Sequence, residues 1–322
     1  MVAKVESHWG ASSQGLRQEL RAKLDQDEIQ RLHLKRPWLH LAVALRQFAF
    51  LAVATWLLSE YSHPLVVVPA ALLSGFTVFN FTVLLHEQLH NLVFAGHHPT
   101  LNAFLGHLYA FWSGISASQF TRWHLDHHVQ LGSATGDPKR HRLSPKVNSR
   151  LLKLAYFTPA LFFLYLRAAA RENATYASGL RRKIAVERVV SSGGHLVMQA
   201  LLLYFCGPGV WLRAYVLPVM FVFPVAFAIN RIGQHYNIKE DDPAGWTTWV
   251  RGHWFWDFLF LNSNYHLEHH YYPGIPFYNL PRLQRMLLPV YHRHQLVPHN
   301  YPDLLYGYLV ENNAPHTDWD FV

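Results

Sequence analysis

Long apolar runs alternate with polar segments along this chain of 322 residues. Two runs, at residues 39–58 and 64–85, hold very few charges, and a helix of about 20 residues can cross the roughly 30 Å hydrocarbon core of a bilayer. Two further runs, at residues 189–205 and 210–230, are interrupted by serine, glycine or proline, and membrane helices tolerate proline where neighbours satisfy the freed backbone groups. The pattern therefore predicts an all-α integral membrane protein with four transmembrane helices at about these positions.

Shorter apolar and amphipathic segments lie outside these runs. Residues 101–116 and 154–166 are short for a full crossing and are expected to form interfacial or re-entrant segments. Residues 15–36 mix charged and apolar positions and predict an amphipathic or exposed helix that ends at Pro37. The expected organisation is a cytosolic N-terminal amphipathic segment at residues 1–37, a membrane domain at 38–290 and a cytosolic C-terminal tail at 291–322.

Positive charge is distributed unevenly between the predicted loops. The chain has 28 Lys and Arg against 20 Asp and Glu, which gives a formal net charge of +8. Residues 1–36 hold seven Lys or Arg and residues 139–153 hold six, whereas the connections at 59–63 and 206–209 hold none. Because Lys and Arg mark the cytoplasmic side of a membrane, both termini are predicted to be cytoplasmic. No long basic run points to a nucleic-acid partner.

Histidines occur in three groups on the predicted cytoplasmic side. The sequences HEQLH, HLDHH and HLEHH place histidines at i, i+3 or i+4, and such residues share one face of a helix. Four spans leave an even number of crossings between the groups, so the topology that charge predicts also brings the groups together. The eight histidines are His86, His90, His124, His127, His128, His266, His269 and His270. His235, just after the fourth span, is a ninth candidate.

The number of histidines determines which metal site is expected. A single tetrahedral zinc takes four ligands, so eight or nine imidazoles suit two metals with open positions, and imidazole is a reasonable ligand for iron. Glu87, Asp126 and Glu268 each adjoin a candidate ligand and could orient imidazoles or tune the metals. Asn262 or Asn264 could complete a coordination sphere through a water molecule.

Two other classes of protein share part of this pattern. In a membrane zinc protease, His86 and His90 would bind zinc and Glu87 would act as the general base. That interpretation leaves the second and third histidine groups unexplained. A non-catalytic membrane scaffold or metal-binding protein would produce no oxygen-dependent product.

The three histidine groups resemble those of the integral-membrane fatty acid desaturase family. The segments GQHYN and NSNYHLEHHYYPGIPFYNLPRL are also similar, the latter to bacterial members, and the resemblance covers about residues 40–290. It implies four membrane helices under a cytosolic helical cap with a di-iron centre, O2 as co-substrate and a bacterial inner membrane location. The implied iron ligands are His86, His90, His124, His127, His128, His235, His266, His269 and His270.

The resemblance leaves the reaction open within one superfamily. The expected activity is introduction of a C=C bond into a fatty acyl chain by an oxidoreductase of lipid metabolism. Glu87 stands where many acyl-lipid desaturases have Asp, and the segment ATGDP is similar to carotenoid ketolases and hydroxylases. Lipid hydroxylation and carotenoid ketolation or hydroxylation therefore remain alternatives.

Electrons for such a reaction are expected from outside the chain. Flavin and haem motifs are missing, and the single cysteine, Cys206, excludes an internal disulfide framework and a Cys-ligated iron–sulfur cluster within the chain. A small acidic carrier such as ferredoxin or cytochrome b5 is expected to dock on the basic cytoplasmic face.

Overall fold

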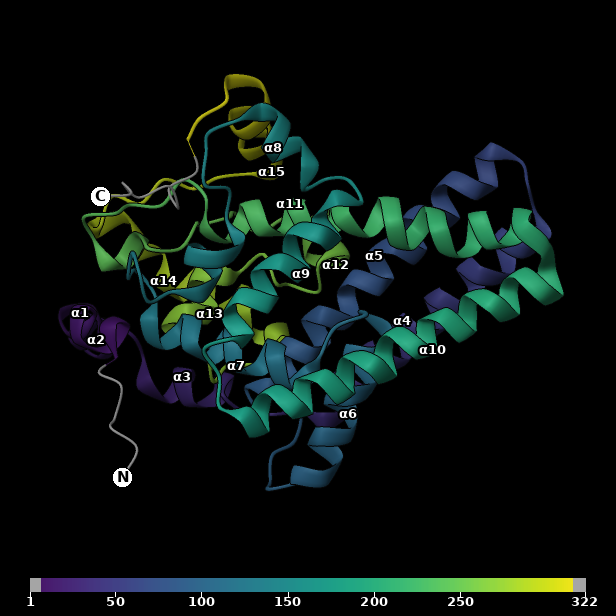
Figure 1. Cartoon of the computed structure of the whole chain (residues 1–322). Coiled ribbons are helices and arrows are strands. Elements are labelled where there is room, and N and C mark those ends of the chain that lie inside the picture. Colours follow the sequence, from purple (N-terminus) through teal and green to yellow (C-terminus); the bar gives the residue numbers. More distant parts are fainter. Residues whose placement is uncertain (1–6, 315–322) are drawn as a thin grey trace.

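The computed structural model describes residues 7–314 and shows a chain built of helices (Figure 1). Residues 1–6 and 315–322, the ends of the predicted N-terminal segment and C-terminal tail, lie outside the described residues. Within residues 7–314 there is one isolated β-bridge, between Val250 and His299, and no β-sheet. The prediction of an all-α fold is confirmed.

The first two long helices form a hairpin. Helix α4 (Pro37–Glu60) and helix α5 (Pro64–Leu89) each begin with proline, whose fixed φ and missing N–H suit the first helical turn. Both are long and apolar enough to cross a membrane, and the predicted spans at 39–58 and 64–85 lie within them. In the most apolar window of each helix, 22% of the residues of α4 are buried and 67% of those of α5. Helix α4 is therefore the more exposed of the two.

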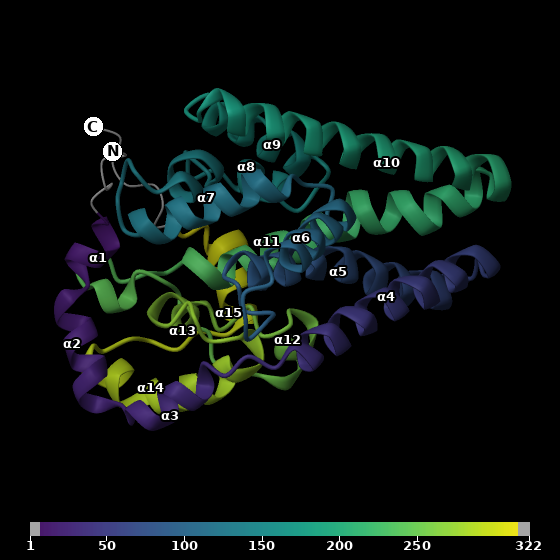
Figure 2. The same cartoon turned by 90° about the horizontal axis from the view of Figure 1, so that it is seen from below.

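The third long apolar stretch is a second hairpin. Helix α10 (Ser178–Trp211) continues through the π-helix η2 (Leu212–Val222) into α11 (Phe223–His235). Gly207 has φ 80° and ψ 171°, a conformation open to glycine, and the chain reverses direction there (Figure 1). The whole stretch is the third candidate span by length and composition, and the two runs predicted at 189–205 and 210–230 lie on either side of the reversal. Figure 2 shows both hairpins extending from the same side of a helical body.

Shorter helices build that body. Helix α6 (Pro99–Trp112) covers most of the segment expected at 101–116, and α9 (Ala160–Asn173) covers the second half of the segment expected at 154–166. Neither helix is a candidate span. Helix α14 (Leu280–Arg293) extends across the predicted boundary between membrane domain and tail at residue 290. The remaining elements are α1 (His8–Ser12), α2 (Gln14–Lys23), α3 (Gln26–Leu32), α6 (Pro99–Trp112), α7 (Ala117–Gln130), η1 (Lys139–Leu143), α8 (Arg150–Ala155), α9 (Ala160–Asn173), η3 (Pro243–Gly245), α12 (Trp254–Leu259), α13 (His266–Tyr271), η4 (Phe277–Asn279), α14 (Leu280–Arg293), α15 (Tyr301–Leu305) and η5 (Tyr306–Glu311).

The single helix predicted over residues 15–36 is wrong. The chain forms α2 and α3 there, with a break at Leu24 and Asp25. Asp25 has extended backbone angles, and its carboxylate accepts a hydrogen bond from the backbone amide of Asp27 at 3.0 Å. An Asp in this position caps the start of a new helix, so it ends the periodic pattern that the charged residues suggest.

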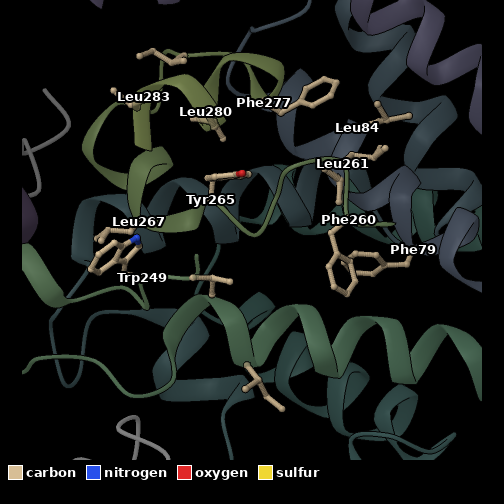
Figure 3. Packing of buried hydrophobic residues seen from close by; sticks show 14 of the residues in the cluster. Phe79, Leu84, Trp249, Phe260, Leu261, Tyr265, Leu267, Phe277, Leu280 and Leu283 are labelled. Atoms are coloured by element: carbon tan, nitrogen blue, oxygen red, sulfur yellow. The ribbon is translucent and has the colours of Figure 1, made fainter. Parts of the chain in front are cut away.

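An aromatic core connects the inner ends of the hairpins to the body. Figure 3 shows Phe79 of α5 beside Phe260, whose ring centroids are 5.8 Å apart, with Leu84, Leu261 and Phe277 nearby. These side chains are less than one-tenth exposed. Their packing holds the loop before α13 against α5, so it fixes the place from which α13 presents its histidines.

Candidate metal centre

All nine candidate histidines lie together in two clusters inside the body. The first cluster has five members and the second has four, and within each cluster the ligand atoms lie within 4.8 Å of one another. The five-histidine cluster contains His86, His90, His124, His128 and His269. The four-histidine cluster contains His127, His235, His266 and His270.

Two helices, α7 and α13, each contribute histidines to both clusters. On α7, His124 and His128 belong to the five-histidine cluster, while His127 belongs to the four-histidine cluster. On α13, His269 belongs to the first cluster, while His266 and His270 belong to the second. The clusters therefore lie side by side, because the same helices hold one ring of the first beside a ring of the second. The ring centroids of His128 and His270 are 4.3 Å apart.

Distances between imidazole nitrogens match those of ligands on a shared metal. The Nε2 atoms of His90 and His124 are 2.9 Å apart, and those of His235 and His266 are 3.0 Å apart. Two nitrogens about 2.0–2.1 Å from one metal, at an angle near 90°, lie about 2.9 Å apart. Nε2 of His86 and Nε2 of His127 are buried without a hydrogen-bond partner in the described part of the chain. Both clusters thus present nitrogen atoms that a metal ion would satisfy.

Burial keeps these imidazoles in the form that binds metal. It lowers the pKa of the seven cluster histidines outside the long hairpins well below 6.5, and neighbouring positive groups lower it further. A neutral imidazole has a free lone pair, so no proton has to leave when a metal binds. These seven are His90, His124, His127, His128, His266, His269 and His270.

Asp137 supports the four-histidine cluster, and sequence reasoning missed it. Nδ1 of His127 donates to the carboxylate of Asp137, with both oxygens 2.8 Å away. The backbone amides of Lys139 and Arg140 donate to the same carboxylate at 3.0 and 3.3 Å. Such a carboxylate fixes the tautomer and orientation of a metal-bound histidine. The signal was Asp137 itself, ten residues after His127 in the segment ATGDP, which indicated only a similarity to other enzymes.

The two glutamates predicted to support the metals have different surroundings. Glu87 accepts a hydrogen bond from the backbone amide of Phe277 at 2.9 Å and lies 3.4 Å from Nδ1 of His86. Glu268 accepts from Gln284 at 2.7 Å and from the hydroxyl of Tyr291 at 2.6 Å. Burial raises the pKa of Glu268 to about 7, because the charged form loses its hydration. Glu87 thus contacts a cluster histidine, while Glu268 ties α13 to α14.

The other predicted supporting residues lie around the site. Asp126 pairs with Arg122 of its own helix at 2.7 Å. The side-chain amide of Asn262, a residue with φ 59°, donates to the carbonyl of Phe277 at 3.2 Å. Asn264 donates to Asp257 at 2.8 Å, and its buried Oδ1 has no partner within residues 7–314.

A cavity adjoins both clusters. It encloses about 930 Å³ of empty space, counting the part open to solvent, and reaches His86 and His124 of one cluster and His266 of the other. Aromatic and aliphatic side chains line much of it, and Lys139 and Arg231 are two basic residues on its wall that sequence reasoning also missed. The apolar part of the wall is Phe79, Val83, Phe120, Trp123, Leu143, Tyr165, Phe227, Phe277 and Leu280. The site therefore combines a largely apolar wall with the two histidine clusters.

Comparisons with known proteins agree with this geometry. A family model described as fatty acid desaturase matches residues 62–302. The chain is 26% identical over 289 residues to the sphingolipid delta(4)-desaturase/C4-monooxygenase DES2 of Homo sapiens, which covers 86% of this chain and 81% of that protein. It is 25% identical over 268 residues to the sphingolipid delta(4)-desaturase DES1 of Drosophila melanogaster, which covers 79% of this chain and 75% of that protein.

Proposed function

Because the chain belongs to the fatty acid desaturase family, we propose that its nine clustered histidines hold two irons and that it desaturates a lipid chain with O2. The enzyme class, a lipid desaturase among the oxidoreductases, follows from the family and from the sphingolipid desaturases that it resembles. The observation that carries the metal assignment is the pair of adjacent clusters, because two all-nitrogen sites of four and five imidazoles exceed what one zinc needs.

The residues of the chain would divide the chemistry among them. When bound, two irons supply the O2 activation and the removal of hydrogen from an unactivated carbon chain. The nine histidines hold the metals, and Asp137 keeps His127 in the tautomer whose Nε2 faces its cluster. The aromatic wall of the cavity excludes water and positions the chain beside both clusters. Glu87, Glu268, Asn262 and Asn264 are proposed to support these ligands, and the same role for Asp126 stays a prediction.

The substrate is proposed to be a long-chain lipid of the acyl or sphingoid type. The relatives are named as sphingolipid desaturases, and the cavity combines an apolar wall with polar side chains next to the metals. Hydroxylation is the second candidate reaction, since the name of the human relative includes a C4-monooxygenase activity. Hydroxylation needs the same hydrogen removal, so small differences in substrate placement separate the two outcomes.

The membrane arrangement is proposed to be four crossings under a cytosolic cap. The hairpin of α4 and α5 and the hairpin that turns at Gly207 support it, because both extend from the body that holds the histidines (Figure 2). The distribution of Lys and Arg supports cytoplasmic termini and a cytoplasmic active site, as in a bacterial inner membrane. The division at residues 37 and 290 is part of this proposal.

The electron donor is proposed to be a small acidic protein of the ferredoxin or cytochrome b5 type. The net charge of +8 supports this, since opposite charges steer association. Turnover with such a donor should fall as ionic strength rises, because salt screens charge attraction. Turnover that does not change with salt would remove the basis for this docking.

A lipid profile tests the function directly. Cells that express the native chain are compared by gas chromatography–mass spectrometry with cells that express His269→Ala, and the iron and zinc content of both purified proteins is measured. A new double bond with the native chain alone, and close to two irons per chain, is the expected result. A new hydroxyl group would favour the second candidate reaction. One zinc and no iron would revive the protease interpretation, in which Glu87 is the general base.

A further inference from the structure

A second cavity lies on the membrane side of the structure. It is bounded by the hairpin of α4 and α5, by Ile229 of α11 and by α12, and it encloses about 930 Å³ of empty space, counting the part open to the surroundings. Its wall on α4 includes Gln47 and Phe50, and its wall on α5 runs from Pro69 to Asn80. None of the described residues that line it is a histidine. We call it the outer groove, to distinguish it from the reaction cavity beside the histidine clusters.

The outer groove is about as long as one leaflet of a bilayer is thick. Asn80 lies eleven residues after Pro69 on α5, and eleven residues of helix extend about 16 Å. A hydrocarbon core is about 30 Å thick, so this length matches half of it. Three apolar lining residues are largely exposed: Leu72 (46%), Phe255 (42%) and Phe258 (48%). In the proposed membrane arrangement the mouth of the groove therefore faces the lipid.

Polar side chains gather at the end of the outer groove that is nearer the histidines. Nδ2 of Asn80 donates to Oε1 of Gln47 at 3.3 Å, and Thr77 lies three residues before Asn80 on the same helix. These three lining residues are at most 5% exposed. Oδ1 of Asn80 is buried and has no hydrogen-bond partner in the described part of the chain. A buried acceptor in apolar surroundings costs free energy until a donor reaches it, so Asn80 points to a ligand that carries a polar hydrogen.

Arg46 indicates the depth of this polar end. Its Cζ lies 5.0 Å from the ring centroid of Phe258 and 5.7 Å from that of Phe50, and both rings line the outer groove. Arg46 precedes Gln47 by one residue, toward the end of α4 that joins the body. An arginine in an apolar membrane helix directs its charged group to the level of the lipid headgroups. The polar end of the groove thus lies near that level, and its apolar end lies deeper.

The side chain of Phe260 lies between the outer groove and the reaction cavity. Its ring centroid is 5.8 Å from that of Phe76, which lines the groove, and 5.8 Å from that of Phe79, which lines the reaction cavity (Figure 3). On α11, Ile229 lines the groove and the next residue, Asn230, lines the reaction cavity. The two spaces are therefore separated by little more than one layer of side chains.

The turn that follows Phe260 is strained. Leu261 and Asn262 are successive non-glycine residues with φ of 50° and 59°. Side chains of L-residues disfavour positive φ, and strained backbone is typical of segments that change conformation. Rotation of the Phe260 side chain would join the outer groove to the reaction cavity.

We propose that a lipid of the bilayer enters the reaction cavity through the outer groove, where it first binds by donating a hydroxyl or amide hydrogen to Oδ1 of Asn80. Its hydrocarbon chain lies along the apolar wall toward Pro69, and displacement of Phe260 lets the lipid pass to the histidines. Carboxylate and ester groups carry no such hydrogen, so the groove selects lipids whose polar end has a hydroxyl or an amide N–H. This inference rests on the proposed desaturase function.

The first test measures binding without turnover. The oxidised, iron-loaded protein in detergent is titrated with a saturated N-acyl sphingoid lipid, and with the same lipid methylated at its hydroxyl oxygens and amide nitrogen. The native protein should bind the unmethylated lipid about 3–10-fold more tightly, as one net hydrogen bond predicts. Asn80→Leu should lose this preference and keep two irons per chain.

Gln199→Leu is the matched control for the binding test. Gln199 also carries an amide in a long apolar helix, α10, where its Nε2 lies 3.4 Å from the carbonyl oxygen of His195, and it lines neither cavity. Both substitutions exchange an amide for leucine, so only Asn80→Leu should change the preference between the two lipids. A preference that survives in Asn80→Leu would overturn the assignment of Asn80.

The second test blocks the outer groove after the protein has folded. In a Cys206→Ser background, Leu72→Cys is alkylated with a small acetamide group or with a bulky pyrenyl maleimide, and Leu201→Cys on α10, where Leu201 is 50% exposed, is the control. The pyrenyl group at position 72 should lower kcat/KM for the lipid at least about tenfold, with two irons still bound. The acetamide group, and either group at position 201, should leave kcat/KM nearly unchanged. When the lipid is loaded anaerobically before the label is attached, the first turnover should be intact.

The outcomes separate this inference from the proposed function. An unchanged kcat/KM with the pyrenyl group at position 72, or loss of the first turnover in preloaded protein, would overturn entry through the groove and leave the desaturase intact. A native protein that binds two irons and the lipid, accepts electrons and forms neither a double bond nor a hydroxyl group would overturn the proposed function. If Asn80→Leu loses iron, the labelling test decides, because it keeps Asn80.

Discussion

Nδ1 of His127 donates to the carboxylate of Asp137, whose two oxygens are both 2.8 Å away, although the two residues are separated by a turn. The contact fixes a buried ring of the four-histidine cluster. Asp137→Ala should therefore lower metal affinity by about 10–100-fold, which is the usual effect of losing such a partner. Iron per chain, measured after dialysis against increasing chelator, gives the affinity, and Asp137→Asn should lie between the native protein and Asp137→Ala.

Asp126→Ala is the matched comparison for Asp137. The sequence predicts that Asp126 supports a neighbouring histidine, but its carboxylate pairs with Arg122 at 2.7 Å. We expect a smaller loss of iron in Asp126→Ala than in Asp137→Ala. Equal losses would show that Asp126 acts on the histidines as its place in HLDHH suggests. No loss in either variant would mean that His127 does not depend on a carboxylate.

The two clusters should lose their metals separately. His266→Ala removes one of four ligands from the second cluster, while the five nitrogens of the first remain in place. Iron should fall from two to about one per chain, and product formation should stop, since the chemistry needs both metals. Metal analysis and lipid profiles of the same preparation check this.

His97→Ala serves as the control for that experiment. His97 is exposed and belongs to neither cluster, so iron content and product should match those of the native protein. Loss of both irons in His266→Ala with intact folding would contradict the separation of the clusters. It would show one cooperative centre instead of two adjacent sites.

The grouping of the nine histidines could be predicted because their spacing is local. Residues at i, i+3 and i+4 share a helix face in any helix, and the charge pattern predicts that all three groups lie on one side of the membrane. The division between clusters is not local. His127 and His128 are adjacent in sequence, yet His127 joins His235 of α11 while His128 joins His86 of α5, and α13 supplies histidines to both clusters. Only tertiary packing decides that division.

The polar groups around the histidines could not be predicted for a related reason. Asp137 reaches His127 through the loop that follows Gly132, a residue with φ 84°, and no helical period describes such a loop. Lys139 and Arg231 meet at one cavity although 92 positions separate them along the chain. The helix over residues 15–36 was mispredicted because an Asp cap outweighed the amphipathic period.

His294 should make the attachment of α2 sensitive to pH. Its Nε2 lies 2.8 Å from Glu19 of α2, and its Nδ1 lies 2.7 Å from Asp242. Burial alone would lower the pKa of His294, but the hydrogen bonds to Asp242 and Glu19 outweigh burial and raise the pKa above 6.5. A histidine with a raised pKa stabilises the folded state fully below its unfolded pKa, and this stabilisation is lost as pH rises through the folded value.

Hydrogen exchange of the α2 amides measures this effect. Protection, corrected for intrinsic exchange, should fall as pH rises from about 6 to 8.5 in the native protein and should stay flat in His294→Gln. Arg293 and Lys239 also face the two carboxylates, at 2.8 and 3.5 Å. The exposed neighbour His292 provides the control His292→Gln, which should keep the native pH dependence. The same pH dependence in His294→Gln would assign the effect to another group.

Gly75 allows the two hairpins to pack closely. A Cβ atom at Gly75 of α5 would lie 2.4 Å from Cβ of Val222 and 2.8 Å from the carbonyl oxygen of Pro218. Gly193 of α10 is also helical, but a Cβ atom there would meet nothing within 4 Å. Small residues allow close approach of membrane helices, and overpacking typically costs about 1–3 kcal/mol. Gly75→Ala should therefore lower the thermal midpoint of the protein in a fixed detergent.

Gly193→Ala should leave that midpoint unchanged or raise it, because alanine favours a helix over glycine by up to about 1 kcal/mol. Both substitutions add one methyl group to a long apolar helix, so the comparison isolates the contact with Val222 and Pro218. Val222→Gly removes the Cβ and Cγ1 atoms that the new methyl would meet, so Gly75→Ala should cost less in that background. Equal shifts for Gly75→Ala and Gly193→Ala would mean that the hairpins do not pack through Gly75.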